Sequence, residues 1–269
     1  MSRYTQAKNT FVDEINLDEY IDLESNKLSY NQLVHSLDKS LKMVLIFGRP
    51  GTGKSLLLSR VYENKKQQKE LYFFDTPMTT KREFFAKLFK VLTKKELPSG
   101  SNIDFETFVE YLRNHKGQRE IVILLDEAQM YPMEILEEIR ILSDSGVIKF
   151  VISLHKTDDE DLIAKEHFQS RIWETIELKN ASRDELKTYV HKKLLKTNQF
   201  EMANLIRNRH ISLIYKYARG NYRETNKLLY TVFEIYEYYD MHDPSKIDDQ
   251  HFSTKIIEMA AIKLGYIHV

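Results

Sequence analysis

The sequence predicts an α/β protein in which a parallel sheet, covered by helices on both faces, is followed by a region made only of helices. Apolar segments alternate with amphipathic helical patterns as far as residue 178, which is typical of a parallel sheet. A glycine-rich stretch, GRPGTGKS, joins one of these segments to a helix. After residue 179 only helical patterns remain.

The expected strands are apolar throughout and do not alternate with polar residues. Such runs are typical of strands that are buried on both faces of a sheet. A further strand-like stretch, IWETIEL, leads into the helical region at residues 172–178. The four apolar runs lie at residues 41–47, 71–74, 121–125 and 150–154.

Two helices of the α/β part are recognisable from their first residues and their apolar stripes. The first is expected to follow an N-capping Asp104, and the second to have Pro132 at its first position. Residues three or four apart share one face of a helix, and that face is expected to be buried. These stripes are Phe105, Phe108 and Leu112 in the first helix, and Ile135, Ile139 and Leu142 in the second.

The helical region begins with SRDE at residues 182–185, which is a capping box. NYRE at residues 221–224 is a second expected helix start, just after the terminating Gly220. The first of these helices has a core stripe of Leu186, Val190 and Leu194. The predicted organisation is an N-terminal segment at 1–24, an α/β domain at 25–178 and a helical domain at 179–269.

Composition excludes several classes of protein and site. Of the 269 residues, 42% are hydrophobic, which is enough for a sizeable core. Lys and Arg total 40, as do Asp and Glu, so the net charge is zero. The chain therefore lacks the overall positive charge that favours non-specific DNA binding, but this does not exclude DNA binding. The chain has no cysteine and therefore no disulfide, thiolate zinc site or cysteine nucleophile. No apolar run approaches the roughly 20 residues that span a bilayer, so a soluble cytoplasmic protein is expected.

The stretch GRPGTGKS, at residues 48–55, matches the P-loop or Walker A pattern between a strand and a helix. Glycines let backbone N–H groups surround phosphates, and the helix N-terminus adds its positive dipole end. Lys54 is expected to contact the β- and γ-phosphates and Ser55 to bind Mg²⁺. The alternative is a glycine-rich turn with a surface lysine. The predicted nucleotide-binding residues are Gly48, Arg49, Pro50, Gly51, Thr52, Gly53, Lys54, Ser55 and Leu56.

Two carboxylates end the apolar run IVILLDEAQ and form a candidate Walker B motif. A strand adjacent to the P-loop strand would deliver Asp126 to the magnesium ion and Glu127 to a water in line with the γ-phosphate. Alone, such a pair is more often an ordinary strand end. Combined with the P-loop, it predicts binding and hydrolysis of ATP or GTP.

These motifs, with the helical region behind them, resemble those of AAA+ ATPases from about residue 27 to about residue 230. The segment LLDEAQMYPMEILEEIRILSDSGVIKFVISLHKT further resembles the ExeA/GspA-like branch, the general secretion pathway protein A type. The resemblance implies a P-loop AAA+ sheet with a C-terminal helical lid, ATP and Mg²⁺ as substrate and cofactor, and a homo-oligomer in the ATP state.

The resemblance also implies sensor residues. The polar sensor at the end of the fourth strand matches His155, with Ser153 as its rival, although histidine departs from the usual Asn, Thr or Gln. The alternative is that His155 merely caps a strand end. The second sensor matches Arg223 at the start of a lid helix, and the alternative is a solvated arginine. By fold analogy, Tyr20 and Ile21 are candidates to contact adenine.

Arg171 lies where family members place an arginine finger, which completes the active site of the adjacent subunit. Its planar and permanently charged group suits the charge on a transferring phosphoryl group. Arg140 is the competing candidate. The alternative for Arg171 is a salt bridge to Glu166 or Glu174.

The biological task is predicted from the resemblance: ATP-driven assembly or remodelling of a partner complex, in a secretion or pilus-like machine. Any membrane role would then require a partner that recruits the chain to the inner face. One alternative is a DNA-associated ATPase of the transposition or replication-initiator type. Residues 179–229 hold 12 Lys and Arg against 4 Asp and Glu, and this excess suits a DNA-contacting surface and equally a lid that faces the nucleotide phosphates. Another is a nucleotide-gated switch that binds ATP or ADP with little turnover.

Overall fold

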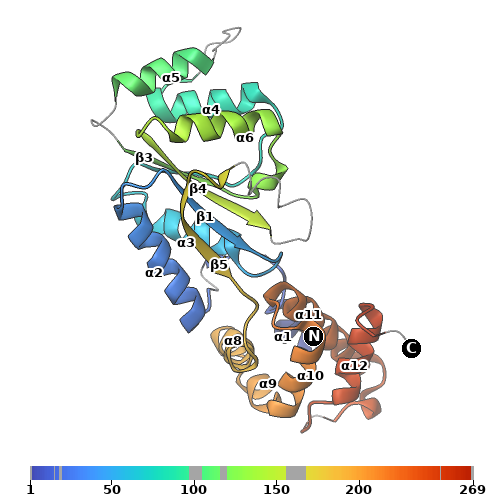
Figure 1. Cartoon of the computed structure of the whole chain (residues 1–269). Coiled ribbons are helices and arrows are strands. Elements are labelled where there is room, and N and C mark those ends of the chain that lie inside the picture. The colour runs from blue at the N-terminus through green and yellow to red at the C-terminus, as the bar shows by residue number, and fades with distance from the viewer. Residues whose placement is uncertain are drawn as a thin grey trace. The chain divides into compact units, whose positions relative to one another are not determined.

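The computed structural model describes residues 2–14, 16–17, 20–96, 105–115, 120–155, 168–248 and 250–267. The chain divides into two compact units (Figure 1). The α/β unit is Leu28–Leu178, and the helical unit is Met1–Lys27 together with Lys179–Val269.

A five-stranded parallel sheet forms the centre of the α/β unit, which confirms the predicted fold class. Because all paired strands are parallel, their carboxyl ends meet at one edge of the sheet. The order across the sheet is β2-β3-β4-β1-β5. The strands are β1 (Met43–Gly48), β2 (Leu71–Phe74), β3 (Ile121–Leu125), β4 (Ile148–His155) and β5 (Ile172–Leu178).

The sequence led us to expect β3 beside β1, but β4 lies between these two strands. Strand β4 pairs with β1 on one side, where Gly48 faces His155, and with β3 on the other, where Leu125 faces Ile152. The expected adjacency is therefore wrong, because an apolar run shows that a strand is buried but not which strand is its neighbour. Asp126 still reaches the P-loop edge, since β1, β4 and β3 run in the same direction.

Helices cover both faces of the sheet (Figure 1). Alternate residues of β1 serve the two cores: Met43 and Leu45 belong to one, and Val44 and Ile46 to the other. The first core includes residues of α4 (Lys81–Thr93), α5 (Phe105–Asn114) and α6 (Met133–Ser143), and the second includes residues of α2 (Glu24–Asp38) and α3 (Lys54–Lys65).

The predicted apolar stripes of α5 and α6 are confirmed, with Phe105 only partly buried. Helix α6 begins at Met133, so Pro132 is its N-cap residue. The expectation that Pro132 would be the first helical residue is therefore wrong by one position. Proline suits this position because its nitrogen carries no hydrogen that the helix would have to satisfy. Asp104, the expected cap of α5, lies outside the described residues.

Strand β5 forms one edge of the sheet and contains an irregularity near its start. Met43 pairs with Ile172 and Val44 with Glu174, so Trp173 is an extra residue without a partner on β1. Such bulges turn a side chain away from the regular pleat. Trp173 is the chain's only tryptophan, and it is 67% exposed.

The helical unit is held by the caps that the sequence predicted. Ser182 and Glu185 form the capping box of α8, and the Asn221 side chain accepts a hydrogen bond from the Glu224 backbone N–H (3.2 Å) at the start of α11. No described helix in either unit could cross a membrane by its length and hydropathy. The C-terminal helices are α8 (Arg183–Lys196), α9 (Phe200–Leu205), α10 (Asn208–Ala218), α11 (Tyr222–His242) and α12 (Thr254–Lys263), with the 3-10 turn η3 (Pro244–Lys246).

An N-terminal helix, α1 (Tyr4–Asn9), is part of the helical unit's core. The Tyr4 ring stacks on Tyr236 with centroids 4.8 Å apart, and Phe11, just after the helix, stacks on Phe233 at 5.9 Å. The sequence did not indicate where residues 1–24 pack, because a six-residue helix gives too short a pattern.

Replacing Phe11 with alanine should destabilise the helical unit by about 3 kcal/mol, because the change removes a fully buried ring from its core. Urea unfolding followed by circular dichroism measures this loss. The matched control is Val12→Ala, since Val12 is the next residue and is exposed. Equal unfolding midpoints for the two variants would show that the N-terminal segment does not contribute to this core.

Candidate nucleotide-binding site

The P-loop joins the carboxyl end of β1 to the first turn of α3. Gly51 and Gly53 have φ angles of 79° and 94°, in the left-handed region that side chains other than glycine rarely adopt. These glycines turn the chain so that α3 begins at Lys54, with Ser55 and Leu56 in its first turn. The loop and helix therefore present backbone N–H groups at one place, as phosphate binding requires.

Gly48, the last residue of β1, lies against the neighbouring strand. A methyl group at this position would overlap the backbone carbonyl of Leu178 at the end of β5 and lie 2.9 Å from Thr52 Oγ1. Glycine is thus needed here for close approach and not for an unusual φ. Its absence of a side chain brings the loop close to the end of β5.

Lys54 is buried and oriented by the loop itself. Its Nζ donates hydrogen bonds to the backbone carbonyls of Gly48 (2.7 Å) and Arg49 (3.1 Å). Thr52 Oγ1 donates to the same Arg49 carbonyl at 2.8 Å. An ammonium group held over the loop, next to a helix N-terminus, can bind an anion such as a phosphate.

Asp126 lies at the same edge of the sheet, just after β3, and is almost fully buried. Its Oδ1 accepts hydrogen bonds from Ser153 Oγ (2.6 Å) and from the Glu127 backbone N–H (3.0 Å). Ser153 is fully buried in β4, so its hydroxyl lies between the strands and orients the carboxylate. The sequence had named Ser153 only as a rival sensor.

Glu127 occupies an unfavourable backbone conformation for a side chain other than glycine, with φ 47° and ψ 48°. Strain of this kind is often found at functional sites. Its Oε1 lies 3.5 Å from His155 Nε2, so the predicted acid and the predicted first sensor contact each other. The Glu127 side chain is 42% exposed and can reach a solvent molecule or ligand.

Tyr131 is a residue of this region that the sequence did not single out. It follows the 3-10 turn η2 (Ala128–Met130), and its buried hydroxyl has no hydrogen-bond partner among the described residues. Burial raises the pKa of this hydroxyl, and the carboxylates of Asp126 and Asp75 raise it further. A tyrosine four or five residues after two acids is too weak a pattern to predict this.

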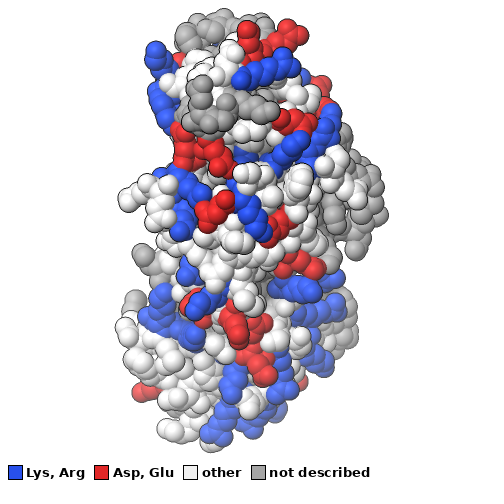
Figure 2. Space-filling view, turned by 60° about the vertical axis from the view of Figure 1, so that its left-hand side comes forward, with Lys and Arg blue, Asp and Glu red and all other residues white. Residues whose placement is uncertain are grey.

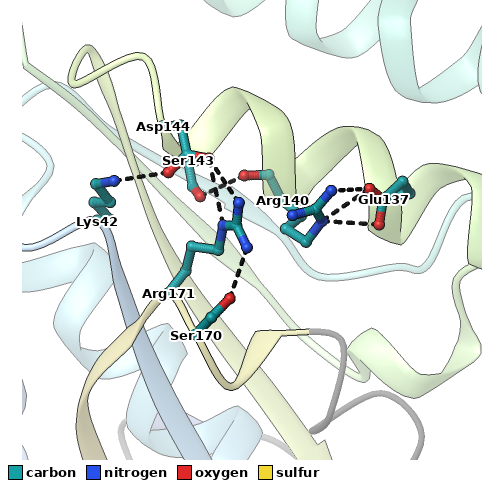
Figure 3. Close-up of polar contacts among 7 residues, drawn as sticks. All are labelled: Lys42, Glu137, Arg140, Ser143, Asp144, Ser170 and Arg171. Atoms are coloured by element: carbon teal, nitrogen blue, oxygen red, sulfur yellow. Dashed lines mark hydrogen bonds and ion pairs between the residues drawn. The ribbon is translucent and has the colours of Figure 1, made fainter.

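Arg171 directly precedes β5, so it lies where the parallel strands begin, at the end of the sheet opposite the P-loop. Its Nη2 binds Asp144 Oδ2 at 3.0 Å, and its Nη1 donates to Ser170 Oγ at 2.6 Å (Figure 3). Lys42, just before β1, binds the other oxygen of Asp144 at 2.7 Å. The six residues of β1 span about 20 Å, so Arg171 is too far from its own P-loop to contact a nucleotide there.

The two cations also affect the acid between them. Burial alone would raise the pKa of Asp144, but the hydrogen bonds from Lys42 and Arg171 outweigh it and hold that pKa below its usual value. Asp144 therefore stays ionised and keeps Arg171 in place.

The other expectations for these arginines have different outcomes. One alternative was a salt bridge between Arg171 and Glu174. Arg171 instead binds Asp144, and Glu174 binds Lys39 at 2.9 Å. Glu166, the other expected partner, lies outside the described residues. Arg140 turns away from Arg171 and donates two 2.8 Å hydrogen bonds to the carboxylate of Glu137 (Figure 3).

The remaining candidates belong to the helical unit. Arg223, in the first turn of α11, donates from Nε to Asp13 Oδ2 at 3.0 Å, and both side chains are about half exposed. Ile21 is buried, and the Tyr20 backbone carbonyl accepts a hydrogen bond from Lys196 Nζ at 3.0 Å. Asp13 thus contacts α11, and Tyr20 contacts α8.

The donors available at the P-loop edge fit Mg²⁺. Ser55 and Asp126 offer a hydroxyl and a carboxylate, which are the hard oxygen ligands that this ion prefers. No group of three or more His, Cys, Asp or Glu side chains suited to a metal occurs in the described ranges. Two protein oxygens suffice for Mg²⁺, because it keeps several waters and takes further oxygens from substrate phosphates.

Comparisons with known proteins agree with this geometry. Residues 37–158 match the family model described as AAA domain. No curated protein matches the sequence. Among solved structures, Cdc6p from Pyrobaculum aerophilum is similar with a TM-score of 0.60 at 16% identity, over 95% of this chain and 70% of that one. The ORC2 protein of Aeropyrum pernix has a TM-score of 0.54 at 16% identity, over 95% and 71%. The Thermotoga maritima RuvB Holliday junction branch migration motor has 0.50 at 19% identity, over 94% and 73%.

These similarities show the P-loop AAA+ fold: a parallel sheet with flanking helices and a helical C-terminal region. At such low identity they show the fold alone. The finer resemblance to the ExeA/GspA-like branch is not confirmed by them and stays a prediction, as does the expected role in secretion.

The Ser153 to Asp126 hydrogen bond should be measurable as a coupling energy. In a double-mutant cycle of Ser153→Ala and Asp126→Ala, we expect about 1.5 to 3 kcal/mol of coupling in the free energy of unfolding, because hydrogen bonds to charged groups fall in this range. A second cycle that pairs Ser153→Ala with Asp75→Ala, an exposed acid at the end of β2, is the control. Coupling below about 0.5 kcal/mol in the first cycle would contradict the contact.

Proposed function

We propose that this chain is an AAA+ ATPase, which binds ATP with Mg²⁺ and hydrolyses it. The observation that carries the proposal is the meeting of Lys54, Asp126 and Glu127 at one edge of the parallel sheet, beside a helix N-terminus. A base, a metal ligand and a phosphate-binding cation are the parts that phosphoryl transfer to water needs.

Each residue of this edge has a defined task in the proposal. The loop N–H groups and Lys54 bind the β- and γ-phosphates. Ser55 and Asp126 hold Mg²⁺, which neutralises developing negative charge on the phosphates when bound. Ser153 keeps the Asp126 carboxylate oriented. Glu127 orients the attacking water and accepts its proton, and His155, at 3.5 Å from Glu127, restrains that carboxylate.

Two arginines complete the proposed site. Arg171 acts on the nucleotide of an adjacent subunit in a homo-oligomer, which is supported by its place at the sheet edge opposite its own P-loop. Arg223 senses the γ-phosphate from the helical domain, residues 179–269, which acts as a lid. Arg140 is a weaker candidate for the trans-acting role, because both oxygens of Glu137 accept from it.

The task of this ATPase, we further propose, is assembly or remodelling of a partner complex in a secretion or pilus-like machine. The support is the sequence resemblance of the segment LLDEAQMYPMEILEEIRIL to the ExeA/GspA-like branch. The proposed place of action is the cytoplasm, with recruitment to the membrane by a protein partner.

Lys54→Ala should weaken ATP binding at least tenfold, whereas Glu127→Gln should bind ATP normally and lose turnover by a factor of about 10² to 10⁴, the usual contribution of a general base. Binding is measured by calorimetry with ATP and Mg²⁺, and turnover by phosphate release. Glu134→Gln, which changes an exposed acid on α6, is the control and should retain both. Normal hydrolysis by Glu127→Gln would remove this residue from the proposed mechanism.

Arg171→Ala should bind ATP as the unchanged chain does and lose turnover by a factor of about 10³ or more, the range for a trans-acting arginine. Mixing it with Lys54→Ala should restore part of the activity, because an intact P-loop can then meet an intact arginine across the subunit boundary. Arg171→Lys, which keeps the charge beside Asp144 but loses the planar fork, should be nearly as inactive.

The same mixing experiment with Arg140→Ala decides between the two candidates. If only that mixture regains activity, Arg140 is the trans-acting residue. A chain that stays monomeric with a non-hydrolysable ATP analogue would contradict both assignments.

A further inference from the structure

The helical unit carries its charges unevenly along the chain. Residues 179–229 hold 12 Lys and Arg against 4 Asp and Glu, whereas residues 230–269 hold 3 against 7. The first range includes α8, α9 and α10, and the second most of α11 and all of α12. In Figure 2, blue side chains gather along the lower right of the view, over the helical unit, and red ones lie nearer its centre.

Three cations of α8 and α10 stand out because they are exposed and make no ion pair with any residue that the structure describes. Arg183 and Lys187 lie one turn apart on the same face of α8, and Arg207 immediately precedes α10. Of the three lysines in residues 230–269, the acidic half, Lys246 pairs with Asp243 and Lys263 with Glu234, whereas Lys255 makes no ion pair with a described residue.

A direct contact links the two helices that carry these cations. His191, one turn after Lys187 on α8, has its Nε2 at 3.0 Å from the backbone carbonyl of Ile206, the residue before Arg207. Burial lowers the pKa of His191, the Ile206 carbonyl opposes this, and the positive charge of Lys187 adds to the lowering. Lys187 therefore lies near His191, and Arg207 directly follows the residue that this histidine contacts, so the contact brings the cations of α8 and the start of α10 to neighbouring parts of the helical unit.

No ion pair with a described residue stabilises these three cations. Arg207 and the exposed Arg209 lie at the N-terminus of α10, where the positive end of the helix dipole disfavours cations. Arg209 donates a hydrogen bond to His210 Nε2 at 3.0 Å, but Arg207 makes no ion pair with a described residue, and like charges placed against a dipole cost free energy in the isolated chain. A polyanion that binds across both helices would offset this cost.

We propose that this basic surface, formed by Arg183, Lys187 and Arg207, binds the phosphate backbone of a nucleic acid. Phosphates follow each other closely along a duplex, so one strand can meet cations from both helices. Arginine forks bind phosphate oxygens in pairs and lysine binds them as a point charge. The biological use of this DNA binding rests on the proposed ATPase function. The contact with DNA itself depends only on residues of the helical unit.

The test is fluorescence anisotropy with a labelled 30-base-pair duplex DNA, between about 50 and 200 mM salt. The full chain should bind with an affinity that falls steeply with salt. The variant Arg183→Ala, Lys187→Ala, Arg207→Ala should bind at least tenfold more weakly at the low salt concentration. Its slope of log affinity against log salt should fall by about 2 to 3, because each lost phosphate contact accounts for about 0.9.

The matched control removes three exposed lysines from the acidic half: Lys246→Ala, Lys255→Ala and Lys263→Ala. It changes the net charge by the same amount and should keep DNA binding. Three outcomes would overturn the inference: no binding by the unchanged chain at low salt, equal losses in both triple variants, or binding to vesicles with anionic lipid that needs the same three residues while DNA is ignored.

ATP turnover of both triple variants, measured in parallel, separates this inference from the proposed function. Turnover should be retained, since none of the six residues belongs to the P-loop edge. Selective loss of DNA binding in a chain that never hydrolyses ATP would support the basic surface and contradict the ATPase. Turnover without any DNA binding would do the reverse.

Discussion

The structure of the α/β unit depends on how tightly strands pack around Gly48. This residue faces His155 of β4 on one side and meets the carbonyl of Leu178 of β5 on the other, where a methyl group would not fit. Its own carbonyl accepts a hydrogen bond from Lys54. The lack of a side chain at this one residue therefore lets the P-loop approach the end of β5, and its carbonyl helps to orient Lys54.

Local signals in the sequence predicted the strands, the capping box of α8, the start of α11 and the P-loop, because each depends on residues within about ten positions of one another. The strand order was not predictable in this way: β4 lies between β1 and β3 for reasons of packing that no short pattern encodes. The same holds for contacts such as Ser153 with Asp126 and Phe11 with Phe233, which join distant segments. The candidate site was thus predictable as a set of residues but not as a set of contacts.

The salt bridge between Arg171 and Asp144 orders the arginine in the isolated chain and is weak enough to let it bind another anion. Both side chains are partly exposed, and pairs of this kind contribute only about 0 to 1 kcal/mol to stability. The contact orders the guanidinium without holding it strongly. Because Lys42 also binds Asp144, the acid would not be left without a cation if Arg171 moved to another anion.

The bulge in β5 gives the chain an internal optical probe. Trp173 is the only tryptophan, it is exposed, and it lies two residues after Arg171 at the edge of the sheet. Indole emission shifts to shorter wavelength when water is removed from around the ring. The fluorescence of the unlabelled protein therefore reports on that one edge, free of signal from any other tryptophan, whenever another surface covers it.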